Sequence, residues 1–226
     1  MYSIFLQTVS ATTEAISTTK TLNLWELAVK GGWIMIVLAL LSIFVVYIFV
    51  ERYIALNKAL KQDTTVFMDR IKDCIHNSDL QGAKNICEAN NSPIGRMIGK
   101  GLARLGRPLN DINQAVENVG KMEIAKMESG VSMLATVSNL APSIGFLGTV
   151  TGMVKAFFDM ANAGNNIDIQ LLSSGIYEAM VTTVGGLIVG LIASFLYSII
   201  VGKINKMVFI LESRTMEFMD LLHEPA

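Results

Sequence analysis

This sequence is poor in charge, cysteine and histidine, and each shortage excludes a class of protein. Charged residues make up 16% of the 226 residues, against about 25% in a soluble domain. A net charge of −1 gives no reason to expect binding to nucleic acid. The two cysteines, Cys74 and Cys87, have one nearby histidine, His76, which is a weak pattern for zinc. We therefore expect no metal site, no cofactor and no nucleic-acid partner.

Motifs for catalysis and for nucleotide binding are also missing. The sequence shows no Ser-His-Asp set, no paired carboxylates and no phosphate loop of the form GxxxxGK[ST]. An enzyme is therefore not expected, and an ion gradient rather than ATP is the expected source of energy for any work that the protein performs.

Hydrophobic residues, in contrast, make up 52% of the chain and form three long apolar stretches. We predict transmembrane helices over residues 31–50, 131–157 and 175–202, since about 20 apolar residues cross a bilayer. The predicted fold class is an all-α integral membrane protein with three transmembrane helices, two of which extend into a helical cytoplasmic domain.

Residues 51–130 carry mixed charges without a strand-like alternation, which predicts this helical domain. A helix is expected to begin at Ser78 or Asp79, and another at Ser92, where Pro93 follows. From about Asn110 the pattern runs on into the second span and predicts one long helix. The charges on this stretch are expected to form a solvated, salt-bridged helix face.

Lysine and arginine predict the orientation, because cytoplasmic flanks carry more of them. They are frequent in residues 51–130 and present in the tail, 203–226, but absent from the loop at 158–174. We therefore expect the N-terminal segment, 1–30, and the loop to lie outside, and the other two regions inside. Three lysines depart from this pattern: Lys20, Lys30 and Lys155.

Small residues distinguish the second and third spans from the bulky first span. They recur every third or fourth residue, which lets helix backbones approach closely in lipid. Plain helix packing without transport explains the same pattern. Pro142 is expected to kink the second span. The glycines that we predict to pack these helices are Gly145, Gly148, Gly152, Gly186 and Gly190.

Glu178 is the only charged residue between Asp168 and Lys203. A lone carboxylate in an apolar span usually marks a path for ions or protons. Thr182 lies one turn further along, and Thr149 and Thr183 add hydroxyls that could pass protons with water. Two simpler explanations stay open. Glu178 could be an acid near a helix N-terminus, and each hydroxyl could bond to the carbonyl four residues before it.

Two segments resemble one family. NLAPSIGFLGTVTGMVKAF (139–157) is similar to the second-span signature of the ExbB/TolQ/MotA proton-channel family, roughly APxLGLLGTVxGMIxxF. IYEAMVTTVGGLIVGLIASFLYS (176–198) is similar to its third-span signature, roughly IAEALxTTxxGLxVAIPAxxxYN. Three spans with a large insertion after the first resemble the ExbB and TolQ branch. Ile192 and Ser198 stand where the family has proline and asparagine.

The resemblance implies a role for several residues and a set of partners. By match to the motifs, Glu178 is similar to the family's span-three glutamate, and Thr149 and Thr183 to its pore-facing threonines. The resemblance implies a homopentamer around an ExbD-like single-span partner, which delivers the energy of the proton-motive force through a TonB-like protein to outer-membrane transport. A TolQ-like role in envelope maintenance and a membrane scaffold without conduction remain alternatives.

Overall fold

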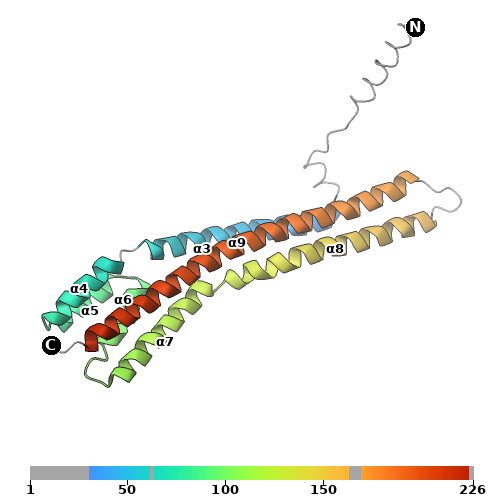
Figure 1. Ribbon diagram of the computed structural model, residues 1–226. Helices are drawn as coiled ribbons and strands as arrows, with labels where there is room; N and C mark the ends of the chain where they lie inside the picture. Colours follow the sequence, from blue (N-terminus) through green and yellow to red (C-terminus); the bar gives the residue numbers. More distant parts are fainter. Residues whose placement is uncertain (1–30, 62–63, 163–168, 224–226) are drawn as a thin grey trace, which may run out of the picture. The chain divides into compact units, whose positions relative to one another are not determined.

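The computed structural model describes residues 31–61, 64–162 and 169–223, and every element in these ranges is a helix. The expected external segment 1–30, residues 163–168 of the expected loop and residues 224–226 of the tail lie outside the described residues. The helices (Figure 1) are α3 (Gly32–Leu60), α4 (Thr64–His76), α5 (Leu80–Ala89), α6 (Pro93–Leu102), α7 (Leu109–Glu128), α8 (Val131–Asn162) and α9 (Ile169–His223).

Three of these helical stretches are long and apolar enough to cross a membrane: α3, the stretch that ends with α8, and α9. Many of their large apolar side chains are exposed, with Trp33 71% and Leu191 75% accessible. Exposed apolar surface of this extent is unfavourable in water and is expected where lipid is the solvent. The predicted all-α membrane fold is therefore confirmed.

The chain divides into two compact units. The first contains Ile144–Gly186 together with the beginning of α3, up to Val37. The second contains Leu38–Ser143 and the chain from Leu187 onward. The candidate site predicted around Glu178 falls within the first unit, and the helical domain falls within the second.

Local capping explains two of the helix starts in the second unit. The Asp79 side chain accepts a hydrogen bond from the Gly82 amide at 2.9 Å and caps α5. The Ser92 hydroxyl accepts one from the Gly95 amide at 2.9 Å and caps α6, which Pro93 begins. Each cap satisfies an amide that has no partner within its helix. Both starts agree with the sequence-based prediction.

The expectation of one uninterrupted helix from Asn110 into the second span is wrong in one respect. The helix α7 ends at Glu128 and α8 begins at Val131. Gly130 between them has φ of +80°, a conformation that glycine adopts at little cost and that ends a right-handed helix. Sequence reasoning overlooked Gly130 as a helix breaker. By contrast, α9 is continuous over 55 residues.

The core of the second unit forms where α9 joins the short helices. Phe218 near the end of α9 is fully buried, and so are Ile71 of α4 and Val116 of α7. A Cβ on Gly101 of α6 would lie 2.6 Å from the Phe218 ring. Because Gly101 has no side chain, the ring of Phe218 packs directly on the backbone of α6.

Candidate functional site

Three glycines of α8 bring the α8 backbone against α9 in the first unit. A Cβ on Gly145 would lie 2.9 Å from the Thr182 carbonyl oxygen and 3.1 Å from the Gly186 Cα. One on Gly148 would lie 2.7 Å from the Thr182 Cβ, and one on Gly152 would lie 2.8 Å from the Ala179 Cβ. These spacings leave no room for a side chain, so the small residues are required for helix contact.

A fourth predicted packing glycine lies in the second unit. A Cβ on Gly190 would lie 2.6 Å from the Pro142 Cγ and 3.0 Å from the Ser138 carbonyl oxygen. Pro142 lies inside α8 without ending it. The proline ring and the glycine therefore fit against each other, and any larger residue at position 190 would have to displace the ring.

Two hydroxyls meet at the α8–α9 contact. The Thr149 and Thr183 hydroxyls are in hydrogen-bonding contact. Thr183 donates to the Gly145 carbonyl oxygen at 3.0 Å, and the Thr149 hydroxyl lies 3.3 Å from the same oxygen. The Thr149–Gly145 contact is the local alternative, and the single hydroxyl proton of Thr149 can be donated either to Gly145 or to Thr183. The bond from Thr183 is different, because it joins two helices through residues that are 38 positions apart.

Thr182 has different surroundings from those of Thr183. Its side chain is buried, 2% accessible, and its hydroxyl donates to the Ala179 carbonyl oxygen at 2.7 Å. It also fills the space that Gly148 leaves open. The hydroxyl of Thr182 therefore bonds locally, to the carbonyl three residues before it rather than four, and its side chain packs against Gly148.

Glu178 lies beside the beginning of α3. A Cβ on Gly32 would come 2.5 Å from the Glu178 carboxylate oxygen Oε1. One on Gly31 would come 3.5 Å from the side chain of Val181, which is one turn along α9 from Glu178. Within the described residues no hydrogen bond joins Glu178 to Thr149, Thr182 or Thr183. The structure thus brings Thr149 and Thr183 together. Among the described residues, the Glu178 carboxylate is not hydrogen-bonded to either of them.

The sequence analysis missed Gly32 as a neighbour of Glu178. The available signal was the Gly31–Gly32 pair at the beginning of the first span, because paired glycines mark places where a backbone approaches another group closely. The helix α9 already contains Ile169, roughly two and a half turns before Glu178. Glu178 is therefore not in the first turn of its helix.

The second unit contains a buried carboxylate of another kind. Glu123 of α7 is 4% accessible and forms ion pairs with Arg96 at 2.5 Å and Lys126 at 2.7 Å. Burial alone would raise the pKa of the Glu123 carboxyl, but the hydrogen bonds from Arg96 and Lys126 outweigh it and hold the pKa below its ordinary value. The expected solvated face is present at Glu117 and Lys121, which pair at 2.7 Å, but the expectation is wrong for Glu123, which is buried.

The cysteines Cys74 and Cys87 are free thiols. Burial, with the neighbouring Cys74 and Glu88 charges, raises the pKa of the Cys87 thiol to about 12. At neutral pH Cys87 is therefore a protonated packing residue and a poor nucleophile or metal ligand.

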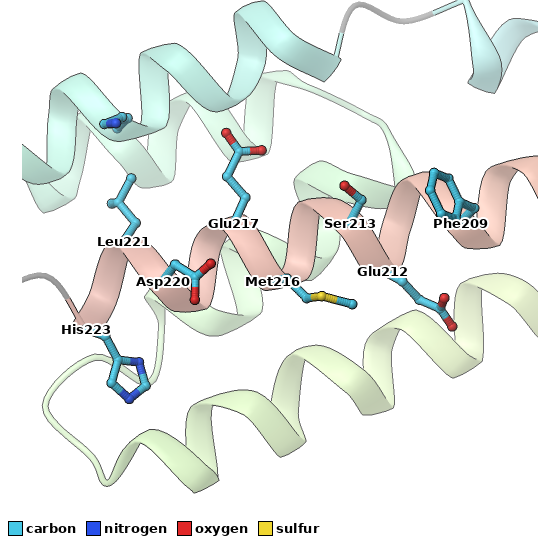
Figure 2. Close-up of a pocket in the computed structure, with 9 residues that line it drawn as sticks. Phe209, Glu212, Ser213, Met216, Glu217, Asp220, Leu221 and His223 are labelled. Atoms are coloured by element: carbon cyan, nitrogen blue, oxygen red, sulfur yellow. The ribbon is translucent and has the colours of Figure 1, made fainter.

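An open groove of about 870 Å³ lies along the end of α9, opposite Lys72 of α4. Figure 2 shows Glu217 and Leu221 pointing from α9 toward α4. Arg214 bonds Glu217 at 2.6 Å and the Thr65 hydroxyl at 2.9 Å, which ties α9 to the beginning of α4. These contacts support the packing of α9 on the domain, and we assign no chemistry to the groove.

Several known proteins are similar to this chain in sequence. An ExbB-like biopolymer transport protein of Synechocystis sp. is 32% identical over 186 residues, which are 81% of this chain and 72% of that protein. An ExbB homologue of Methanothermobacter thermautotrophicus is 29% identical over 181 residues, 80% of this chain and 63% of that protein. The Tol-Pal system protein TolQ of Haemophilus influenzae is 33% identical over 104 residues, 46% of this chain and 45% of TolQ.

The sequence profile of one family matches a little more than half of the chain. The match spans residues 89–213, which include α6, α7, α8 and most of α9. The matched region contains Glu178, the two bonded threonines and all the packing glycines. This chain therefore belongs to the MotA/TolQ/ExbB proton channel family.

Proposed function

We propose that this protein is a proton-channel subunit of the bacterial inner membrane that harnesses the proton-motive force to energise TonB-dependent outer-membrane transport. It works as a homo-oligomeric ring, a pentamer by family resemblance, around an ExbD-like single-span partner, and a TonB-like protein carries the energy onward. The N-terminus faces the periplasm and the C-terminus the cytoplasm, as the distribution of lysine and arginine favours.

The observation that carries this proposal is Glu178 itself. It is the only charged side chain of α9 before Lys203, in a helix that is apolar enough to cross a membrane. A carboxylate is costly in such a span and persists where it has a function. It is partly buried beside a glycine of α3, and no ion pair holds it among the residues that the structure describes. In our proposal Glu178 takes up and releases the transported proton.

The hydroxyls of Thr149 and Thr183 support a continuation of this proton path beyond Glu178. Each hydroxyl has one proton to donate. If Thr183 donates to the Gly145 carbonyl oxygen, Thr149 donates to Thr183, and both protons are used inside the cluster. The oxygens that remain can only accept. Such a cluster favours a water molecule or a protonated carboxyl group as its partner, which is what an ExbD-like helix with a membrane aspartate would offer. Thr182 positions α9 beside this path.

The test is growth of cells that lack their own ExbB-type gene on a scarce iron chelate. They carry this chain as wild type or as Glu178→Gln, with membrane levels compared by blotting. Glutamine keeps the shape and hydrogen bonding of glutamate but cannot cycle a proton. We expect wild type to restore growth and Glu178→Gln to lose it at equal abundance. Growth of the variant at the wild-type rate would instead favour a scaffold without conduction.

A TolQ-like role is the second candidate, because the TolQ of Haemophilus influenzae is among the similar proteins. A TolQ-like role predicts that the chain rescues a different defect. Wild type would then restore detergent resistance to cells that lack TolQ, and it would fail to restore growth on iron chelate.

A further inference from the structure

A hollow of about 380 Å³ opens between α3, α6 and α7 in the second unit, and most of the charged side chains that line it are cationic. Four positive side chains line it, Arg52, Lys58, Arg96 and Lys126, against the single carboxylate of Glu123. The rest of the wall is largely apolar and includes Leu56, Pro93 and Met127. Positive charge beside apolar surface suits an amphipathic ligand with an anionic group at one end and an apolar group at the other.

Two of the four cations are already engaged. Arg96 and Lys126 form the ion pairs that satisfy the buried Glu123. Arg96 also donates to the Asn91 side-chain oxygen at 3.0 Å. These groups build a rigid back wall, and their charge is largely balanced.

The other two cations have weak internal partners or none. The closest groups to Arg52 are the Lys126 carbonyl oxygen, at 3.5 Å, and the Glu51 carboxylate, at 4.0 Å. Both are at the outer limit for such interactions. The Nε of Arg52 is buried without a hydrogen-bond partner. Lys58 is exposed and forms no ion pair within the described part of the chain. Arg52 and Lys58 therefore have positive charge that no close partner balances among the described residues.

The position of the hollow in the chain indicates the ligand. Arg52 follows the apolar run of the first span directly, after Val50 and Glu51, and Lys58 lies six residues further along the same helix. Cations at the end of a span meet the phosphate groups of the adjoining leaflet, and basic pockets between helices at that level bind anionic head groups. An arginine fork matches phosphate oxygens in shape and charge.

We propose that this hollow binds the phosphate of an anionic phospholipid head group, with Arg52 and Lys58 as the cations that hold it and the Glu123 ion pairs as its rigid wall. The site is separate from the proton path and does not depend on the proposed function. It would anchor the junction between the first span and the helical domain to the membrane surface.

The experiment uses the full chain purified in neutral detergent and follows its thermal unfolding midpoint. Short-chain phosphatidylglycerol, short-chain phosphatidylcholine and inorganic phosphate are titrated separately. The variants are Arg52→Gln with Lys58→Gln, Lys58→Gln alone, and Lys61→Gln. The last is the matched control, because it removes one charge near the end of the same segment from a residue that does not line the hollow.

We expect phosphatidylglycerol to raise the wild-type midpoint and phosphatidylcholine to leave it unchanged. The apparent affinity should fall about fivefold for Lys58→Gln and roughly 30-fold for the double variant, since each cation at a membrane surface contributes about 1 kcal/mol. Lys61→Gln should bind like wild type. Lys58→Gln removes only an exposed side chain, so it gives a result even if the double variant folds poorly.

Four results would overturn the proposal. One is an equal response of wild type and Lys58→Gln to phosphatidylglycerol, and another is an equal loss in Lys61→Gln. The third is an equal response to phosphatidylcholine. A response to inorganic phosphate as strong as that to phosphatidylglycerol would assign the site to a soluble phosphate and refute the lipid as its ligand.

Discussion

The two units of this protein satisfy their polar groups by opposite means. In the first unit, hydroxyls of Thr149 and Thr183 bond to each other and to a backbone carbonyl, and no ion pair is found among its described residues. In the second unit, the buried Glu123 is held by Arg96 and Lys126. Where no water is available, neutral groups that share a backbone oxygen are inexpensive to bury, whereas a charge needs counter-charges around it.

The comparison makes Glu178 the exception in its own unit. Among the described residues it has no ion-pair partner of the kind that Glu123 has, and its carboxylate lies close to Gly32 at the beginning of α3. A structural carboxylate would be expected to resemble Glu123. The difference between the two acids supports the proposal that Glu178 takes part in proton transport, whereas Glu123 has a structural role.

The largest effect is expected from filling the α8–α9 contact. Gly145→Ala places a Cβ 2.9 Å from a backbone oxygen that cannot move without shifting α9, and we expect a loss of about 3 kcal/mol, the upper end for overpacking. Gly202→Ala is the control, because nothing lies within 4 Å of that position, and it should be neutral or stabilising. Thermal unfolding in detergent measures both. Equal midpoints would show that the helices do not touch as described.

A smaller effect is expected from breaking the ion pairs that Glu123 forms with Arg96 and Lys126, and this effect depends on pH. The pKa of Glu123 in the folded protein is lower than its ordinary value of 4.5. The stability that ionised Glu123 contributes is therefore fully present above pH 4.5. It is lost as the pH falls through the lower pKa that Glu123 has in the folded protein.

Arg96→Met should remove about 2 kcal/mol at neutral pH, because it leaves a buried carboxylate with one partner. It should also weaken the loss of stability on acidification. The control is Glu117→Gln, whose partner Lys121 is exposed, and it should change stability by less than about 0.5 kcal/mol. An unchanged acid profile in Arg96→Met would contradict the assignment of this pH dependence to Glu123.

The smallest effect on stability, about 1 kcal/mol or less, is expected from removing one hydroxyl of the first unit, and here function is the informative readout. Thr183→Val keeps the shape but breaks the bond between helices, and we expect slower growth on iron chelate. Thr182→Val breaks only the local bond to Ala179 and should grow normally. If both variants grow alike, the hydroxyl pair has no special part in the proton path.

Much of the fold could be predicted from local patterns. Run length predicted three spans, and the caps at Asp79 and Ser92 began helices where their side chains suggested. The break at Gly130 was missed because a single glycine within a helical pattern is compatible with either a helix or its end. Its positive φ becomes apparent only in the folded chain.

The candidate site was predicted less completely, since residue spacing reports only on faces of a single helix. Thr182 shares a face with Glu178 by spacing, yet its hydroxyl bonds locally, and Thr183 instead reaches Gly145. The neighbour of Glu178 turned out to be Gly32, which lies far away in sequence. Neither contact follows from periodicity, because the register between two helices depends on how their surfaces fit.

The sequence by itself determined that this is a helical membrane protein with three spans, one lone carboxylate and small residues where helices meet. These features follow from hydropathy, residue volume and the cost of burying charge, which act locally along the chain. Only the tertiary structure decided which hydroxyls pair, what faces Glu178 and which cations gather around one hollow. Those contacts join residues that are distant in sequence, and close packing of complete helix surfaces selects them.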